Sequence, residues 1–241
     1  MMRLACLAML IALPLRAGAL PDDPAAAAFV RANLASTLYH EVGHALIDVR
    51  GLPHDGEEDA ADAFAALMID RLWPEAEAQA IVRATAEAFL AYSEAGDEAP
   101  LGAHSLDVVR YYNLVCLFYG ADPDGRGPLA EALELPAPRR ESCPEEAEAA
   151  ASDWNDRLAG MPPQDHGPGL RLVAPRDRDA LTTLIAAEVG RLNGEIGWPR
   201  RVDVSVEPCG EANAFYDPRA RRIVICTEYA AELASLFGWV E

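Results

Sequence analysis

The sequence contains no lysine: all 20 of its basic residues are arginine, set against 39 aspartate and glutamate residues. Without lysine, the chain cannot form a lysine Schiff base or use a lysine nucleophile. The formal net charge of −19 predicts a surface that repels nucleic acid and anionic lipid. Nucleic-acid partners are therefore not expected.

The sequence also lacks an apolar run of the roughly 20 residues that a membrane-spanning helix needs. The run Leu4–Leu15 follows Arg3 and precedes the small residues Ala17–Ala19. This order is typical of a secretory signal peptide. We expect residues 1–19 to be removed, leaving a secreted or periplasmic protein without stable membrane insertion. An uncleaved anchor is the alternative.

Cysteine is scarce, with five in 241 residues. Loss of Cys6 with the signal peptide leaves an even number in a chain bound for an oxidising compartment, which predicts two disulfides. Closeness in sequence favours Cys116 with Cys143 and Cys209 with Cys226 among the possible connectivities. The alternative for Cys116 is a free buried thiol.

Helical periodicity predicts that most of the chain before residue 159 is α-helical. Helices are expected over 25–49, over 57–72, after Pro74, from a Ser105 N-cap to Gly120, over 144–158 and, further on, over 178–195. A proline-rich stretch occupies 122–143, and 160–178 is typical of a linker. The sequence thus predicts a helical lobe over 20–159 and a second lobe over 179–241.

The second lobe is predicted to contain strands. Alternating valines over Val202–Val206 and the β-branched residues 223–225 indicate strands. Segment 213–216 is expected to pair with 222–226 across a turn, before a helix that begins at Thr227. The predicted class is α+β, mainly helical, with a small antiparallel sheet near the C-terminus.

Residues 39–47 read YHEVGHALI. Positions four apart lie on one face of a helix, so His40 and His44 can direct imidazole nitrogens at one metal ion. Glu41 is rotated by about 100° and can reach a water molecule on that ion instead. Two ordinary helix histidines are the alternative. Because Glu41 is the one charged residue within 37–46, as a buried metal-bearing helix requires, we predict a zinc site.

A catalytic zinc ion needs a third protein ligand and an open position for water. The stretch GEEDAADAF places Glu58 and Asp62 four residues apart. We expect Glu58 to be the third ligand and Asp62 to accept the other N–H of a ligand histidine, which fixes its tautomer. Arg50 stands where some zinc proteases carry a third histidine, which excludes that arrangement.

Other assignments remain open for this stretch. Glu57, Asp48 and His54 are alternatives to Glu58 as the third ligand. A capping box with Asp55 as N-cap would also occupy Glu58 and keep it away from a metal ion.

The sequence resembles DUF4344, a family of metallopeptidases. The resemblance rests on YHEVGHALIDVRGLP, GEEDAADAFA, HSLDVVRYYNLVCLFYGADP and CGEANAFYDPRARRIVICTE. The first two stretches are shared with zinc peptidases at large, and the last two are more specific. The resemblance implies a zincin-like fold and a zinc-dependent enzyme that acts on peptide or protein substrates.

The order of the segments differs from the family. Family members carry NAFYDP before the HExxH helix, whereas here it follows. The resemblance therefore implies a chain in permuted order, joined within 160–178, where a surface linker tolerates such a change. Val109 and Thr227 stand where the family tends to carry glutamine and tyrosine.

The expected chemistry is hydrolysis of a peptide bond. Two imidazoles and a carboxylate lower the pKa of zinc-bound water toward about 7, and Glu41 is expected to act as the general base. A second donor is needed for the oxyanion. We select His104 and Tyr216 as catalytic candidates, with Arg110 and Tyr112 as alternatives.

The predicted function is a secreted zinc-dependent metallopeptidase. A non-catalytic secreted binding module that keeps zinc for stability is the alternative. Such a structural site is usually closed by four protein ligands, and it has no use for a base at Glu41.

Overall fold

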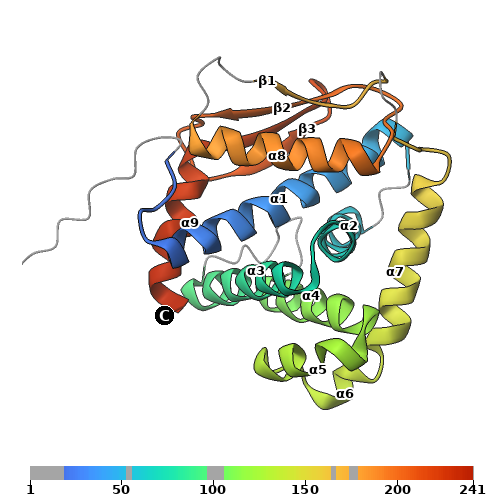
Figure 1. Ribbon diagram of the computed structural model, residues 1–241, viewed down its shortest axis with the longest axis vertical. Coiled ribbons are helices and arrows are strands. Elements are labelled where there is room, and N and C mark those ends of the chain that lie inside the picture. Colours follow the sequence, from blue (N-terminus) through green and yellow to red (C-terminus); the bar gives the residue numbers. More distant parts are fainter. Residues whose placement is uncertain (1–18, 53–55, 97–105, 164–166, 174–178, 241) are drawn as a thin grey trace, which may run out of the picture.

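The computed structural model of the protein describes residues 19–52, 56–96, 106–163, 167–173 and 179–240. A four-stranded sheet and a group of helices lie on either side of the long helix α1 (Pro24–Arg50) (Figure 1). On the helical side α1 packs on α2 (Glu57–Leu72) and α3 (Glu75–Ala95), and on the other it contacts β3 (Ala214–Asp217) and β4 (Arg222–Cys226). α1 is therefore the element that every layer shares.

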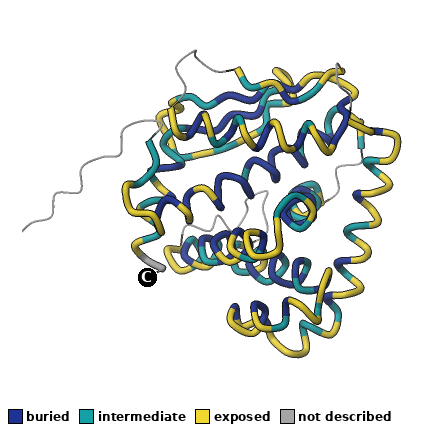
Figure 2. Tube along the Cα trace, in the orientation of Figure 1, coloured by how far each residue is buried: buried dark blue, intermediate teal, exposed yellow. Residues whose placement is uncertain are grey.

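The ends of α1 follow from its local sequence. The Asp23 carboxylate accepts a hydrogen bond from the Ala26 N–H at 2.8 Å, and Pro24 lies in the first turn. Gly51 ends the helix with a φ of 63°, a left-handed conformation that glycine adopts without strain. Much of α1 is buried, as its dark blue colour in Figure 2 shows.

The predicted helices before residue 159 are confirmed, with some shifted ends. After α3 come α4 (Asp107–Ala121), α5 (Pro123–Ala132), α6 (Ala137–Arg140) and α7 (Cys143–Leu158). The N-cap of α4 is Leu106, one residue beyond the expected Ser105, which lies outside the described residues. The proline-rich stretch 122–143 folds into α5 and α6 because proline suits the first turn of a helix, where each of them has one.

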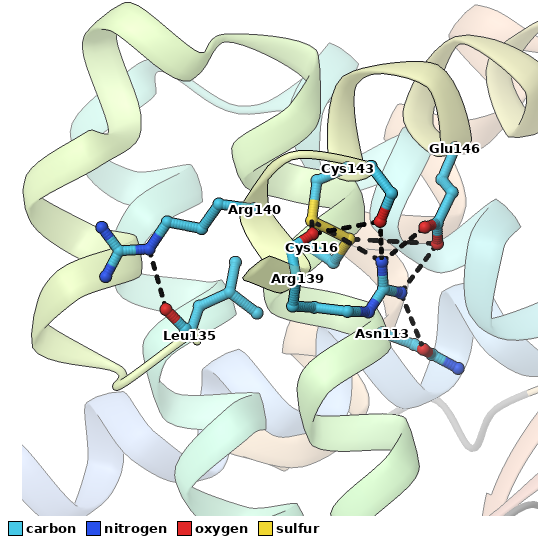
Figure 3. Close-up of a disulfide and its surroundings, with 8 residues drawn as sticks. Asn113, Cys116, Leu135, Arg139, Arg140, Cys143 and Glu146 are labelled. Atoms are coloured by element: carbon cyan, nitrogen blue, oxygen red, sulfur yellow. Dashed lines mark hydrogen bonds and ion pairs between the residues drawn. A yellow bond between two sulfur atoms is a disulfide. The ribbon is translucent and has the colours of Figure 1, made fainter. Parts of the chain in front are cut away.

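The predicted disulfide Cys116–Cys143 joins α4 to α7, with an S–S distance of 2.01 Å (Figure 3). Arg139 lies beside it, and its guanidinium donates to the Glu146 carboxylate at 2.7 Å. The disulfide and this ion pair hold the end of the helical layer together.

The sheet has the strand order β1-β2-β4-β3. β1 (Leu170–Val173), β2 (Val202–Glu207) and β4 are parallel, and β3 is antiparallel to β4. The predicted hairpin of 213–216 with 222–226 is confirmed, but the expectation of an antiparallel sheet holds for this hairpin alone. β3 reverses the chain between β2 and β4, so those two strands run in the same direction.

Two features attach the sheet to its neighbours. Cys209–Cys226 forms the second predicted disulfide, with an S–S distance of 2.02 Å, between the loop after β2 and the end of β4. The Asn193 side chain of α8 (Ala180–Glu195) makes hydrogen bonds of 2.9 Å with both the N–H and the C=O of Leu170 in β1. Both features fix strand ends.

β1 lies inside the segment 160–178 that the sequence indicates as a linker. Its four residues are too few to reveal alternation, and HGPG comes directly before them. The division into lobes 20–159 and 179–241 stays a prediction. One buried cluster nevertheless contains side chains from both, from α1 to α9 (Thr227–Val240). None of the described helices has the length and hydropathy that crossing a bilayer requires.

A buried polar network also joins α1 to α8. The Tyr39 hydroxyl donates to Oε2 of Glu188 at 2.6 Å and accepts from Nε1 of Trp73 at 3.0 Å. Arg191 forms an ion pair with Glu188 at 3.2 Å. Tyr39 and Glu188 are 0% and 2% exposed, so both depend on this network rather than on water for their hydrogen bonds.

Replacing Tyr39 by phenylalanine is expected to lower the free energy of unfolding by about 1 to 3 kcal/mol, because a buried carboxylate loses a donor. Thermal or urea unfolding measures this change. Tyr112→Phe is the matched control, since the Tyr112 hydroxyl has no hydrogen-bond partner among the described residues. Equal stability of the two variants would contradict the importance of the network.

Candidate metal centre

α1 and α2 bring three potential metal ligands together. The Nε2 atoms of His40 and His44 are 3.0 Å apart, and Oε2 of Glu58 lies 3.3 Å from the first and 3.2 Å from the second. Among the described residues, this is the group of histidine and acidic side chains whose ligand atoms all lie within 4.8 Å of one another. Two imidazole nitrogens and a carboxylate oxygen that converge so closely need a cation between them, either a proton or a metal ion. The donor set fits a divalent metal.

The position of Glu58 depends on close packing between α1 and α2. A Cβ atom added to Gly43 would lie 2.9 Å from Cα and 3.1 Å from Cβ of Ala61 on α2. A side chain at Gly43 would therefore push α2 away from the two histidines. Glycine costs roughly 1 kcal/mol relative to alanine inside a helix, and this contact explains why the helix carries one here.

A carboxylate also contacts the second ring nitrogen, Nδ1, of each histidine. Nδ1 of His40 lies 2.7 Å from Oδ1 of Asp62, and Nδ1 of His44 lies 2.8 Å from Oε1 of Glu57. A carboxylate on Nδ1 makes that nitrogen the N–H and leaves Nε2 to face Glu58. Asp62 therefore has the contact expected of it, whereas Glu57, an alternative third ligand, contacts the far side of His44.

Asp62 is held in turn by Arg110 of α4. Nε and one terminal nitrogen of Arg110 donate to the two Asp62 oxygens at 2.8 Å each, and the guanidinium lies 4.3 Å from the centre of the Phe89 ring. Burial raises the pKa of Asp62, but the bonds from Arg110 and His40 outweigh it and hold that pKa well below its usual range. Sequence reasoning listed Arg110 as an oxyanion donor and missed this role, which only the contact of α4 with α2 reveals.

The same contacts set the protonation of the histidines. Burial lowers the pKa of His40, but hydrogen bonds to Asp62 and Glu58 and the nearby carboxylate charges outweigh it and raise that pKa to about 9. For His44, burial also lowers the pKa, and the bonds to Glu58 and Glu57 produce a net rise. In the absence of a metal ion, both histidines therefore hold a proton more strongly than a free imidazole does.

Glu41 lines a cavity beside the metal ligands. The cavity has a volume of about 440 Å³, and His40, Asp62 and Arg110 contribute to its wall. Glu41 is 6% exposed. The carboxylate of Glu41 therefore adjoins the candidate metal centre in a largely buried setting.

The other sequence candidates lie elsewhere. The Tyr216 hydroxyl donates to Oδ2 of Asp48 at 2.6 Å, and neither residue lines the cavity. Asp48, another alternative third ligand, thus ties α1 to β3. The N-cap of α2 is Gly56, with no side-chain cap bond, so the alternative of a capping box that occupies Glu58 is not seen in the described part of the chain. Three candidates lie outside the described residues: His54, Asp55 and His104.

Tyr229 of α9 is a cavity residue that sequence reasoning missed. It lines the same wall as His40 and Glu41, and its hydroxyl lies 3.2 Å from Oγ1 of Thr37 on α1. Burial raises the pKa of its hydroxyl, so Tyr229 stays a neutral donor at physiological pH. No local motif marks this residue, because it reaches the site only through the packing of α9 on α1.

The comparison with protein families gives one match. A family model described as "Putative metallopeptidase", DUF4344, matches residues 18–158 and 178–240. The first stretch contains the three candidate ligands and Glu41. The unmatched residues between these two stretches, 159–177, overlap the segment 160–178 where a permuted joint is predicted, and the order of segments stays a prediction. No curated protein and no solved structure matches the chain.

Replacing Gly43 by alanine is expected to weaken metal binding by about tenfold or more, because α2 must move away from the histidines. Overpacking should also cost about 1 to 3 kcal/mol of stability. Calorimetric titration of the metal-free protein with a divalent metal measures the affinity. Gly190→Ala is the matched control, since a Cβ there meets nothing within 4 Å. Unchanged affinity in Gly43→Ala would refute the packing argument.

His40 of the metal-free protein is expected to titrate at about pH 9, followed by the NMR shifts of its ring. Since this pKa is raised above 6.5, the stability that protonated His40 contributes is full below pH 6.5 and is lost as pH rises through about 9. Asp62→Asn should lower the midpoint, because it removes the largest favourable contact. A midpoint near 6.5 in the unaltered protein would contradict the geometry.

Proposed function

Since this chain belongs to DUF4344, the family described as metallopeptidases, we propose that it is a zinc-dependent peptidase whose metal ligands are His40, His44 and Glu58. The observation that carries the proposal is the convergence of these three side chains beside Glu41. Two imidazoles and one carboxylate are a ligand set of catalytic zinc enzymes. When bound, zinc would supply a Lewis acid that acidifies water and polarises a carbonyl group.

Glu41 is the proposed general base. It follows His40 directly on α1, so its side chain is rotated by about 100° from the metal-binding face. It takes the proton from the attacking water and passes it to the leaving nitrogen of the peptide. The buried wall of the cavity limits competing water around its carboxylate.

Asp62 and Glu57 orient the two histidines. Each carboxylate holds an Nδ1–H, so each imidazole presents Nε2 to the metal. Arg110 balances the charge of Asp62 and keeps that carboxylate in place. These contacts support metal binding without any direct contact with substrate.

Tyr229 is the proposed donor to the oxyanion, in preference to Tyr216. It shares the cavity wall with Glu41, whereas the Tyr216 hydroxyl is already bound to Asp48. A neutral hydroxyl in a buried site can stabilise a developing negative charge. His104, the other candidate, remains a prediction for a residue outside the described part of the chain.

The edge strand β3 is the proposed place for an extended substrate. β3 pairs with β4 on one side and is the last strand in the sheet order. Ala212 and Asn213, which precede this strand, and Ala214, its first residue, line the cavity with His40. An extended peptide that pairs with this edge would pass beside the candidate metal centre.

We also propose that the enzyme acts outside the cytoplasm. Cys116–Cys143 and Cys209–Cys226 are disulfides of the kind that persist in secreted and periplasmic proteins. The proposed signal peptide lies in residues outside the described part of the chain.

Glu41→Gln is expected to retain zinc and to lose peptide hydrolysis by at least about a hundredfold, because general-base catalysis contributes on the order of 10² to 10⁴. Metal analysis of purified protein and a peptide-library assay measure the two quantities. Glu195→Gln, an exposed position at the end of α8, is the matched control and should keep full activity.

The outcomes separate two functions. Cleavage by the unaltered protein and the control, but not by Glu41→Gln, supports the peptidase. Bound zinc without cleavage by any of the three proteins would overturn it in favour of a zinc-stabilised binding module.

A further inference from the structure

We propose that Glu228 is a positioning residue: its carboxylate holds the loop 208–213 in the orientation in which that loop forms part of the cavity wall beside the candidate metal centre. The inference rests on the proposed peptidase function, because an extended peptide would lie along this wall. It adds to that function a residue that acts through the loop rather than through direct contact with the peptide.

The loop 208–213 forms part of the cavity beside the candidate metal centre. It joins β2 to β3, and its last two residues, Ala212 and Asn213, line the cavity of about 440 Å³ together with His40. The Asn213 C=O accepts a hydrogen bond of 3.0 Å from the Cys226 N–H, which fixes the end of the loop next to the sheet. The beginning of the loop lies outside the sheet, because β2 has already ended.

Glu228 of α9 binds the beginning of this loop with both of its carboxylate oxygens. Oε2 accepts a hydrogen bond from the Cys209 N–H at 3.1 Å, and Oε1 accepts one from the Gly210 N–H at 2.8 Å. The Thr227 hydroxyl also donates to Oε2, at 3.3 Å. Bonds from two successive backbone N–H groups to one carboxylate are charge-assisted, and together they fix the orientation of the backbone between them.

The same bonds keep Glu228 ionised. The hydrogen bonds from Cys209 and Gly210 hold the pKa of its carboxyl group below the usual value, because they favour the charged form. The carboxylate is therefore available as a double acceptor at neutral pH.

Glu228 also lies next to a cavity residue of α9. Tyr229 follows it directly in the first turn of that helix and lines the cavity. Glu228 therefore joins the loop that supplies Ala212 and Asn213 to the helix that supplies Tyr229. Because one side chain connects the two segments, it sets the spacing between these parts of the cavity wall.

The disulfide Cys209–Cys226 links neighbouring positions but leaves the orientation of the loop open. It joins the two Sγ atoms, and rotation about the side-chain bonds of Cys209 still allows its backbone to turn. The bonds to Glu228 act on the backbone itself. Loss of the Glu228 carboxylate is therefore expected to loosen the loop without detaching it, and the fold should persist.

Glu228→Ala is expected to raise KM for an extended peptide about fivefold or more, while kcat stays within about twofold. Only the molecules with the loop in place bind the peptide, so the apparent affinity falls with their fraction. Glu228→Gln keeps one acceptor oxygen and should give an intermediate KM. Steady-state kinetics measure both constants, with a peptide chosen from those that the unaltered protein cleaves in the peptide library.

Glu211→Ala is the matched control. Glu211 is exposed in the same loop, and its carboxylate has no hydrogen bond or ion pair among the described residues, so KM and kcat should stay unchanged. An unchanged KM in Glu228→Ala, or a fall in kcat alone, overturns the proposal. Lower thermal stability with an unchanged KM would also overturn it, because Glu228 would then serve only the start of α9, where an acidic residue favours the helix dipole.

Amide hydrogen exchange in the metal-free protein separates this inference from the peptidase function. The Ala214 N–H, which donates to Oδ1 of Asn213 at 2.8 Å, reports whether the loosening reaches the cavity wall. It should exchange about fivefold faster or more in Glu228→Ala, and at the unaltered rate in Glu211→Ala. Faster exchange without cleavage of any peptide supports the positioning role and leaves only the peptidase function overturned. Unchanged exchange at Ala214 overturns the positioning role, whatever the peptidase assay shows.

Discussion

The contact between α1 and α2 at Gly43 is the constraint on which the candidate centre depends. Because Gly43 has no side chain, the backbone of Ala61 on α2 packs directly against α1. This close packing places Glu58 beside the two histidines. Histidines four apart supply two donors without help from the fold, but the third donor exists only while the helices remain this close. Stability and metal binding are therefore linked through one interface.

Around that interface, acidic and basic side chains alternate. His40 lies between Glu58 and Asp62, and Asp62 lies between His40 and Arg110. In a buried setting each group depends on its neighbours for its ionisation, as the raised pKa of His40 and the lowered pKa of Asp62 indicate. Arg110 matters here because the chain is strongly acidic and has few cations to offset buried carboxylates.

The last part of the chain supplies the residues that complete the wall of the cavity beside the candidate metal centre. α9 and the segment leading into β3 provide Tyr229, Asn213 and Glu232 to the cavity wall. The Tyr39–Glu188 bond and the shared core hold that part against α1. A peptide at β3 would therefore meet the base from one part of the chain and the proposed oxyanion donor from the other.

The sequence alone determined the features that depend on local periodicity and spacing. These are the helices, the hairpin and the histidine pair with Glu41, because neighbours in sequence dictate them. The sequence favoured the two disulfide pairings, and the fold decided them. Only tertiary structure decided the parallel pairing of β2 with β4, the strand within 160–178, the partner of Tyr216 and the place of Tyr229. Those features arise from contacts between residues far apart in the chain, and no local pattern encodes such contacts.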